Sequence, residues 1–267
     1  MVRWGRRCSW SIAVPTGPLV ARRPVLSRGF RRFCGTQWWF RSSIGSGNRS
    51  LRLGVDVDSD GVLDPAEVFD QLGADYEAAF HEAPLVWEGL DALLARLRPG
   101  DEVLDLGSGT GRPVSERLSG AGCGVTGLDV SAAMIELARQ RVPEARFELT
   151  DIRDRDFPPE SFHVVVAFFS FLTLSRAEIR TMLERVRRWL APEGMLALLT
   201  VPGDIEQRVV RFLGYPIRAT SFTAEQWPDA LEEAGLEVLW SRSEPFVPTG
   251  RSRAETEQHL LLLARKT

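Results

Sequence analysis

The stretch that decides the fold is residues 103–111, which read Val103-Leu104-Asp105-Leu106-Gly107-Ser108-Gly109-Thr110-Gly111. Apolar residues around a single acid predict a short buried strand, and glycines at alternate positions predict a turn whose backbone can lie against a ligand. A helical pattern resumes after Arg112-Pro113, and proline is acceptable in a first turn, so the glycine turn should open a helix whose free N–H groups point back at the ligand. The stretch is typical of a site for a nucleotide-type ligand.

The spacing of the glycines separates two kinds of nucleotide site. A dinucleotide-binding turn requires Gly-x-Gly-x-x-Gly, whereas here the third glycine comes one residue early and Arg112 takes the required place. The pattern Asp-x-Gly-x-Gly-x-Gly instead resembles motif I of the class I S-adenosylmethionine-dependent methyltransferases. This resemblance implies that the glycines pack under the methionine part of the cofactor and that Asp105 helps to hold its amino group. A plain tight turn is the alternative, although such a turn rarely needs three glycines and an acid at fixed offsets.

Two further acids end predicted strands. Residues 124–129 read as a strand that ends in Asp129, where a doubly wound sheet places the acceptor for a ribose diol. Asp129 follows Gly111 by 18 residues, near the usual offset of about 20. Residues 145–150 predict a third strand before Asp151-Ile152, which resembles the family's adenine contact, an acid for the exocyclic amine and an aliphatic residue over the ring. A helix cap at Asp129 and an ordinary loop acid at Asp151 remain the alternatives.

The resemblance therefore implies one set of cofactor-binding residues for S-adenosyl-L-methionine, and the sequence identifies no metal ligands. The set comprises Asp105, Gly107, Ser108, Gly109, Gly111, Asp129, Val130, Met134, Asp151, Ile152 and Phe168.

Alternation of strands and helices predicts the architecture. Residues 162–169 are a continuous apolar run, as expected of a strand that helices cover on both faces. An amphipathic helix over 176–190 and a strand over 195–201 continue the alternation, which favours a parallel sheet. Strands near 236–240 and 259–264 should form a terminal hairpin. The expected fold is α/β, a doubly wound, mostly parallel seven-stranded sheet with one antiparallel strand and helices on both faces, the Rossmann-like methyltransferase fold.

The methyl-transfer end of the site is less clearly marked. The resemblance implies that Phe168 to Phe171 line it, and no Asn-Pro-Pro-Tyr or Asp-Pro-Pro-Tyr occurs, which speaks against methylation of adenine N6 or of a glutamine amide. His163 is expected to be buried and hydrogen-bonded rather than catalytic. His81, Tyr215 and Glu225 are further titratable candidates, and none is assigned as a general base.

Two segments flank the core motifs. Apolar residues at helical spacing over 67–80 and 87–97 predict two helices, within an N-terminal helical cap at 66–98 of the kind that many small-molecule methyltransferases fold over the cofactor. Tyr76 in this cap either contacts the ligand or only packs. Residues 203–222 are the least regular part of the domain, where loops specific to function are expected.

Residues 56–67 match the EF-hand calcium loop, with acids at positions 1, 3, 5 and 9, Gly61 at position 6 and Glu67 at position 12. No entering helix and no partner loop accompany the match. The same residues also predict a helix start, with Asp64 as N-cap, Pro65 at N1 and Glu67 in a capping box. We favour the cap and keep structural calcium as the alternative.

Residues 1–55 differ from the rest of the chain. They hold 11 of the 33 Lys and Arg residues and no Asp or Glu, so residues 56–267 carry 22 basic and 36 acidic residues, a net charge of −14. No helical or strand period persists, and we expect a disordered extension before a methyltransferase domain at 56–267. A mis-assigned start and a mitochondrial transit peptide are the two main interpretations, and a basic nucleic-acid arm is a third.

Composition bounds the compartment and the partners. Cys8, Cys34 and Cys123 lack disulfide or metal-ligand spacing, which predicts a reducing compartment, the cytoplasm, or the mitochondrion if residues 1–55 are a transit peptide. No run of 18 apolar residues occurs, so no membrane span is predicted. The acidic domain argues against a nucleic-acid partner. We expect methyl transfer to a small organic acceptor by in-line displacement; an RNA or DNA methyltransferase and a non-catalytic cofactor- or calcium-binding module are the alternatives.

Overall fold

A computed structural model describes residues 61–249 and 256–267 of the chain. The predicted extension at 1–55 and the first five residues of the calcium-loop match, 56–60, lie outside the described residues. The described residues belong to one compact unit.

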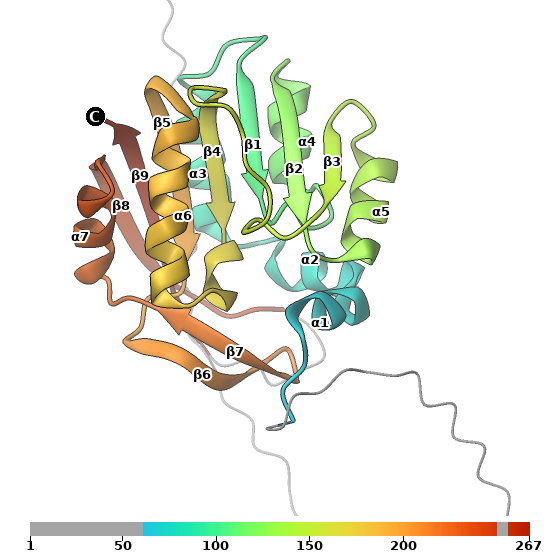
Figure 1. The fold of residues 1–267 in the computed structure, drawn as a ribbon. Coiled ribbons are helices and arrows are strands. Elements are labelled where there is room, and N and C mark those ends of the chain that lie inside the picture. The colour runs from blue at the N-terminus through green and yellow to red at the C-terminus, as the bar shows by residue number, and fades with distance from the viewer. Residues whose placement is uncertain (1–60, 250–255) are drawn as a thin grey trace, which may run out of the picture. The chain divides into compact units, whose positions relative to one another are not determined.

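A mixed sheet forms the centre of this unit, with the strand order β3-β2-β1-β4-β5-β9-β8. Its strands are β1 (Glu102–Leu106), β2 (Gly124–Asp129), β3 (Arg146–Leu149), β4 (Phe162–Phe168), β5 (Leu190–Thr200), β8 (Leu236–Phe246) and β9 (Glu257–Lys266). The first five run parallel, whereas β9 is antiparallel to both β5 and β8 (Figure 1). The predicted seven-stranded, mostly parallel sheet with one antiparallel strand is confirmed.

Helices cover both faces of the sheet, as predicted (Figure 1). The helices of the described residues are α1 (Pro65–Leu72), α2 (Ala74–Phe80), α3 (Pro84–Leu94), α4 (Val114–Gly120), α5 (Ala132–Arg141), α6 (Arg176–Trp189), α7 (Gln226–Glu233) and the 3-10 turn η1 (Ser170–Thr173). None of the helices in the described part of the chain has the length and apolar character needed to cross a membrane.

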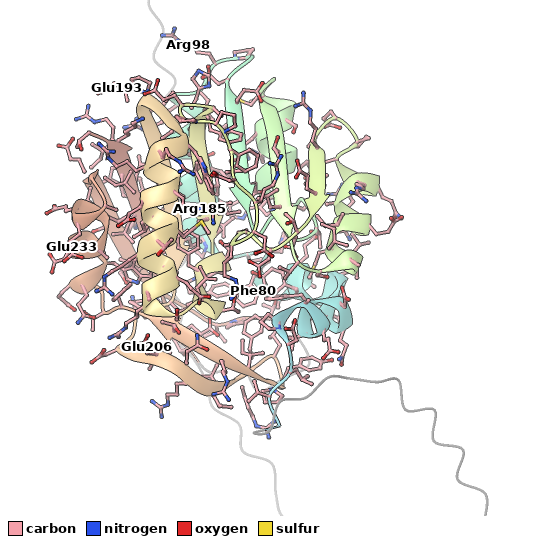
Figure 2. The ribbon with its side chains drawn as sticks, viewed as in Figure 1. Phe80, Arg98, Arg185, Glu193, Glu206 and Glu233 are labelled. Carbon is pink, nitrogen blue, oxygen red and sulfur yellow. The ribbon has the colours of Figure 1, made fainter. Side chains whose placement is uncertain are left out.

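The core is divided by the sheet because neighbouring strand residues point to opposite faces. Leu104 and Val165 pack with residues of α6 and α7, whereas Val103 and Val164 pack with residues of α3 and α4. Figure 2 shows charged side chains, such as that of Glu233, projecting outward from the surface.

The segment before β1 forms three helices rather than the predicted two. Gly73, with a φ of 46°, ends α1 and precedes α2. Left-handed backbone of this kind stops a helix, so the apolar spacing that continues through Gly73 was misleading. The helix start was predicted correctly, because Asp64 accepts a hydrogen bond from the amide of Ala66 (2.8 Å) with Pro65 at N1.

The expectation of irregular structure at 203–222 is wrong. This segment is an antiparallel hairpin of β6 (Ile205–Phe212) and β7 (Tyr215–Ser221). Leu213 and Gly214 connect the strands with φ values of 46° and 95°, and two positive φ values are what a tight two-residue hairpin turn requires. The hairpin and α1 lie beyond the carboxyl ends of the parallel strands (Figure 1), and Leu63 N donates to Pro216 O (3.1 Å).

Candidate active site

The glycine turn follows β1 directly, and its three glycines have different tasks. Their φ values are all positive: 72° at Gly107, 53° at Gly109 and 78° at Gly111. A Cβ on Gly107 would lie 2.5 Å from the Cβ of Ser170, and one on Gly111 would lie 3.1 Å from a methyl of Val142. A Cβ on Gly109 would meet nothing within 4 Å. Two glycines are therefore required by packing against the protein, and the third borders open space.

Asp105 lies under this turn and is 2% exposed. Its Oδ2 accepts a hydrogen bond from the Ser115 hydroxyl (2.7 Å) at the start of α4. Burial raises the pKa of Asp105 to about 7, although the Ser115 hydrogen bond opposes the rise and the nearby Asp129 adds to it. A ligand cation beside this carboxyl would favour its ionised form.

Asp129, at the end of β2, ties the turn to the next strand. One of its carboxylate oxygens accepts from the amide of Gly109 (2.8 Å) and the other from the amide of Ser131 (2.9 Å). Burial raises the pKa of Asp129, against the effect of these hydrogen bonds. The cap of α5 is Ser131, which accepts from Met134 N (3.1 Å). Each Asp129 oxygen keeps further acceptor capacity for a ligand hydroxyl.

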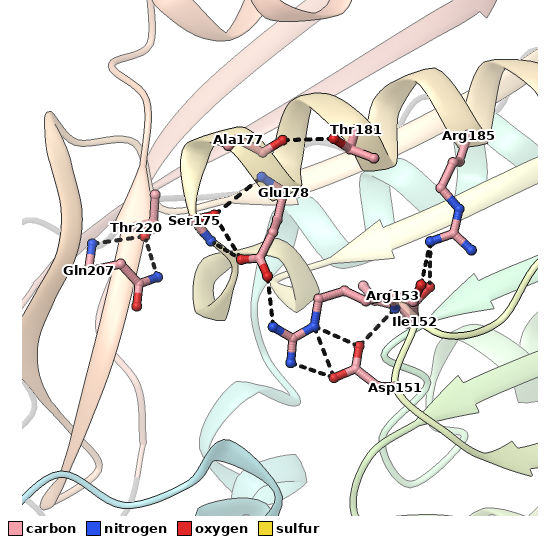
Figure 3. A network of polar contacts seen from close by, with 10 residues as sticks. All are labelled: Asp151, Ile152, Arg153, Ser175, Ala177, Glu178, Thr181, Arg185, Gln207 and Thr220. Carbon is pink, nitrogen blue, oxygen red and sulfur yellow. Dashed lines mark hydrogen bonds and ion pairs between the residues drawn. The ribbon is translucent and has the colours of Figure 1, made fainter. Parts of the chain in front are cut away.

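Asp151 is held by an arginine that the sequence analysis did not identify. Arg153 donates to both oxygens of Asp151, at 2.6 to 3.0 Å, and extends its other nitrogen to Glu178 (2.8 Å), as Figure 3 shows. Partial burial raises the pKa of Asp151, but the hydrogen bonds from Arg153 outweigh this effect and hold the pKa below its ordinary value. Asp151 is therefore a carboxylate at neutral pH that already has a cationic partner.

The loop that carries Asp151 is fixed from α6. Glu178 forms a reciprocal capping box with Ser175 at the start of this helix. Arg185, two turns later, donates to the backbone oxygens of Ile152 (3.4 Å) and Arg153 (2.7 Å), as Figure 3 also shows. An arginine two residues after a strand-end acid was the available signal for the Asp151–Arg153 pair.

Two cavities flank the glycine turn, of about 140 and 250 Å³. Tyr76, Gly107, Gly109, Phe168 and Phe169 border both. The first is also lined by Asp129, Val130, Met134, Asp151 and Ile152, and the second by Asp105 and Ser108. Of the predicted cofactor-binding residues, Gly111 alone borders neither cavity, because it packs against Val142 and Phe147. We call the two cavities together the cleft.

Helices α1 and α2 border the cleft and are bonded to its other side through two carboxylates, Asp70 and Glu77. Asp70 of α1 accepts from the Ser131 hydroxyl (2.5 Å) and from the amide of Ala133 (3.0 Å) at the start of α5. Glu77 of α2 accepts from the Thr110 hydroxyl (2.6 Å). Glu77 also forms an ion pair with Arg141. The predicted cap is therefore bonded to the glycine turn and to α5.

Tyr76 is packed and also faces the cleft, so its contact with a ligand stays a prediction. It borders both cavities and also packs edge-on against Phe69, with ring centroids 5.6 Å apart. Burial raises the pKa of its hydroxyl, as do the charges of Asp129 and Glu257.

Trp87 of α3 lines the second cavity. Its indole N–H donates to the backbone oxygen of His81 (3.0 Å), and the guanidinium carbon of Arg117 lies 5.6 Å from its ring centroid.

Of the remaining titratable candidates, His81 borders the cleft and the others lie away from it. His163 is exposed rather than buried, because it is the second residue of β4, at the amino end of the strand away from the cleft, and its Nδ1 accepts from Glu102 N (3.0 Å). His81 borders the second cavity, whereas Tyr215 and Glu225 border neither. Phe168 and Phe169 line the cleft, but Phe171 is 1% exposed in the core beneath η1, so its predicted place in the site wall is wrong.

Comparison with known proteins agrees with this geometry. A family model described as a methyltransferase domain matches residues 103–194, from β1 to the start of β5. The 27-O-demethylrifamycin SV methyltransferase of Amycolatopsis mediterranei is 30% identical over 194 residues, which cover 64% of this chain and 70% of the relative. The chain belongs to the class I S-adenosylmethionine-dependent methyltransferases. It spans 41 to 59% of the length of several other curated relatives that this methyltransferase matches.

Solved structures share the fold of this methyltransferase. A S-adenosylmethionine-dependent methyltransferase from Methanosarcina mazei has a TM-score of 0.57 at 20% identity and covers 66% of this chain and 96% of its own. The Burkholderia thailandensis 1,6-didemethyltoxoflavin-N1-methyltransferase, solved with its acceptor and S-adenosylhomocysteine, has a TM-score of 0.51 at 23% identity and covers 77% of this chain and 92% of its own.

Proposed function

We propose that this methyltransferase acts on a small organic acceptor that enters the cleft beside the cofactor. This proposal rests on the size and shape of the cleft, two concave cavities of about 140 and 250 Å³ that residues of α1 and α2 border. A concave site of this size suits a small molecule better than a macromolecule. The aromatic residues Phe168 and Phe169 on its wall favour an acceptor with an apolar body.

The residues of the cleft fit the cofactor. The hydroxyls of Ser108 and Ser170 are buried without a hydrogen-bond partner among the described residues. Open space borders Gly109, where a bound ligand could approach the backbone. Unsatisfied buried hydroxyls and an open glycine are features that a polar ligand with several hydrogen-bonding groups would complete.

Each predicted binding residue has a proposed role. Asp105 would hold the amino group of the methionine part, and Asp129 would accept from a ribose hydroxyl. Ile152 would cover the adenine ring, with Val130 and Met134 on the same wall. Asp151 would meet the exocyclic amine through an oxygen that it shares with Arg153. Gly111 supports the turn from behind.

The protein contributes positioning and exclusion of water. When bound, the cofactor supplies an electrophilic methyl group on a positively charged sulfur. Holding acceptor and methyl group in line is worth up to roughly 7–11 kcal/mol of the activation barrier. The ring faces of Phe168 or Phe169 beside the positive sulfur would add about 0.5–2 kcal/mol of cation–π stabilisation.

Similar proteins support an acceptor of this kind. The names of two of them specify a demethylrifamycin and a didemethyltoxoflavin as acceptors. We further propose that the enzyme works in the reducing environment of the cytoplasm, with residues 56–267 as its catalytic domain. The net charge of −14 on those residues disfavours a nucleic-acid acceptor.

Calorimetric titration of S-adenosylmethionine and S-adenosylhomocysteine into the full-length protein tests the cofactor assignment. Asp129→Ala should weaken binding by the loss of a charged hydrogen bond, roughly 1.5–3 kcal/mol. Asp229→Ala removes an exposed carboxylate of α7 and should bind like the wild type. Equal affinity of the Asp129 variant and the wild type would refute the ribose assignment.

A screen of phenolic and carboxylic compounds, with methylated products detected by mass spectrometry, tests the acceptor class. Methylation of RNA alone would contradict this class.

A further inference from the structure

A buried imidazole lies behind the wall of the cleft. The side chain of His259, near the start of β9, is 1% exposed, and its Nδ1 has no hydrogen-bond partner among the residues that the structure describes. Its Nε2 lies 3.4 Å from a carboxylate oxygen of Glu257, two positions earlier and thus on the same face of the strand. One ring nitrogen faces an anion, and the other is buried and unused.

The rings around His259 are also rings of the cleft. Its ring centroid lies 4.8 Å from that of Phe169, 4.9 Å from that of Phe246 and 6.4 Å from that of Phe80. Phe169 borders both cavities, and Phe80, labelled in Figure 2, borders the second. A single layer of aromatic rings therefore separates the imidazole from the cleft.

Phe169, one of the residues in that layer, has an unusual backbone conformation. Phe169 has φ 60° and ψ 0°, in the left-handed region that residues other than glycine rarely adopt. Its amide donates to the backbone oxygen of Leu199 (2.7 Å), so β5 holds it there. Such conformations cluster at ligand-binding and catalytic sites. The backbone of Phe169 is therefore held in a strained conformation at a position that borders both His259 and the cleft.

Glu257 connects His259 with the cleft electrostatically. After burial and the charge of Asp129, the charge of Glu257 is the next cause that raises the pKa of Tyr76. Tyr76 borders both cavities. The carboxylate therefore acts on a group of the cleft as well as on the imidazole.

We propose that His259 is the catalytic base of this methyltransferase and that Glu257 is the residue that positions it. The inference rests on the proposed function. A carboxylate beside Nε2 favours the tautomer with its hydrogen on Nε2, which leaves a lone pair on Nδ1. An acid orients a catalytic imidazole in the same way in serine hydrolases, through the other ring nitrogen. A side-chain rotation of Phe169 would open the path from the cleft to Nδ1.

The proposed step also selects the acceptor class. A hydroxyl of the acceptor gives its proton to Nδ1 of His259, its electron pair forms the bond to the methyl carbon, and the pair of the methyl–sulfur bond stays on sulfur. The imidazolium then releases the proton to water. A phenol or enol on an apolar body needs such a base, whereas a carboxylate acceptor is already ionised at neutral pH and does not.

Charged and titratable groups from three elements lie around this site. Glu257 shares the strand of His259, and Tyr76 comes from α2. Glu244 of β8 is the register partner of His259 and is paired with Arg242. Because Glu244 already has a cationic partner, Glu257 is the carboxylate that is left to orient the imidazole.

Nitrogen NMR of the full-length protein, labelled at histidine, tests the tautomer without any acceptor. The chain has three histidines, and the spectrum of His259→Asn identifies the signal of His259. We expect the hydrogen on Nε2 and a bare Nδ1, with and without S-adenosylhomocysteine. A hydrogen on Nδ1 would overturn the proposal whatever the activity of the enzyme.

Two acceptor probes, 4-methoxyphenol, which is protonated at neutral pH, and 4-methoxybenzoate, which is ionised, test the chemistry. His259→Asn keeps a polar atom near the Nδ1 position but cannot take a proton. It should lower kcat for a phenolic acceptor by roughly 100-fold or more, spare a carboxylate acceptor, and leave the affinity for S-adenosylhomocysteine within about twofold. Glu257→Gln, which removes the carboxylate that orients the ring, should lower kcat for the phenolic acceptor and spare the carboxylate acceptor. His163→Asn, at the amino end of β4, is the matched control and should behave like the wild type.

The outcomes separate the two proposals. A His259→Asn enzyme that methylates the phenol at the wild-type rate overturns the base and leaves the proposed function intact. A wild-type enzyme that binds S-adenosylhomocysteine but methylates no small acceptor of the screen contradicts the proposed function, and the base with it.

Discussion

The floor and the roof of the cleft are built by different means. The floor, residues 105–134, is held mainly through its backbone: the amides of Gly107 and Ser108 donate to Leu128 O at 2.8 and 2.9 Å, and the amide of Gly109 donates to the Asp129 carboxylate (2.8 Å). The roof, α1 and α2, is held by side chains, with Asp70 bonded to a residue 61 positions away and Glu77 to one 33 positions away. Backbone geometry tolerates few substitutions, whereas polar side chains can be exchanged. Differences in acceptor choice are therefore expected to arise in the roof.

The largest expected effect breaks the floor itself. Gly107→Ala places a Cβ 2.5 Å from Ser170 at a positive φ, so strain of about 1–2 kcal/mol and overpacking of about 1–3 kcal/mol should add. Gly109→Ala is the matched control, because it carries the strain but meets no atom within 4 Å. Urea unfolding should show a clearly larger loss for Gly107→Ala. Equal losses would mean that the contact with Ser170 relaxes freely.

The second test measures how stability depends on pH through one residue of the floor, Asp105. The pKa of Asp105 is about 7 in the folded protein against 3.8 in the unfolded chain, so the folded state retains a proton that the unfolded state releases. Its contribution to stability should fall as the pH rises from about 4 to about 7 and then level off. Asp105→Asn should abolish this fall in urea unfolding. A wild-type profile parallel to that of the variant would contradict the raised pKa.

Cofactor affinity should show the opposite dependence on pH. In the proposed site the ionised Asp105 would pair with the ammonium of S-adenosylhomocysteine, so affinity should rise as the pH rises through about 7. Calorimetry on wild type and Asp105→Asn checks this, and the dependence should be weaker in the variant.

A smaller effect should loosen the roof. Glu77→Gln removes the charge that Arg141 pairs with but keeps an acceptor for Thr110. We expect a loss of about 1 kcal/mol or less in stability and a several-fold faster release of S-adenosylhomocysteine. Stopped-flow dissociation measures the rate. An unchanged release rate would show that α2 does not retain the ligand.

The smallest expected effect lies outside both regions. Removal of residues 1–55 should leave the affinity for S-adenosylhomocysteine unchanged within about twofold, because the residues that line the cleft all follow residue 63. A large loss, with strong dependence on salt, would support the basic-arm interpretation.

The floor was predictable from sequence because its information is local. Glycines at fixed offsets and acids at strand ends predict where Asp105, Asp129 and Asp151 lie. The apolar run of β4 indicates that helices cover both faces of the sheet. The burial of His163 was misjudged, because a side chain near the amino end of an apolar strand can still reach solvent even when its neighbour Phe162 is buried.

The roof was not predictable in the same way. The break at Gly73 and the turn at Leu213 and Gly214 depend on single left-handed residues inside patterns that continue on both sides. The partner of Asp151 is a side chain, Arg153, whose direction the spacing alone does not fix. In the sequence, Glu257 and His259 look like ordinary strand residues. Only the fold brings the aromatic rings of α2 and β8 next to His259.

Trp87 gives the cleft an optical signal of its own. It lines the second cavity under the guanidinium of Arg117, whereas Trp189 and Trp227 are 0% exposed in the core on the other face of the sheet. Four of the eight tryptophans of the chain lie within residues 1–55, so the background in the shortened chain falls from seven tryptophans to three, Trp189, Trp227 and Trp240, none of which borders either cavity. Ligand entry should therefore change the emission of one identifiable fluorophore, and Trp87→Phe should silence that change. Unlabelled protein could then report, in real time, how fast the cleft fills and empties.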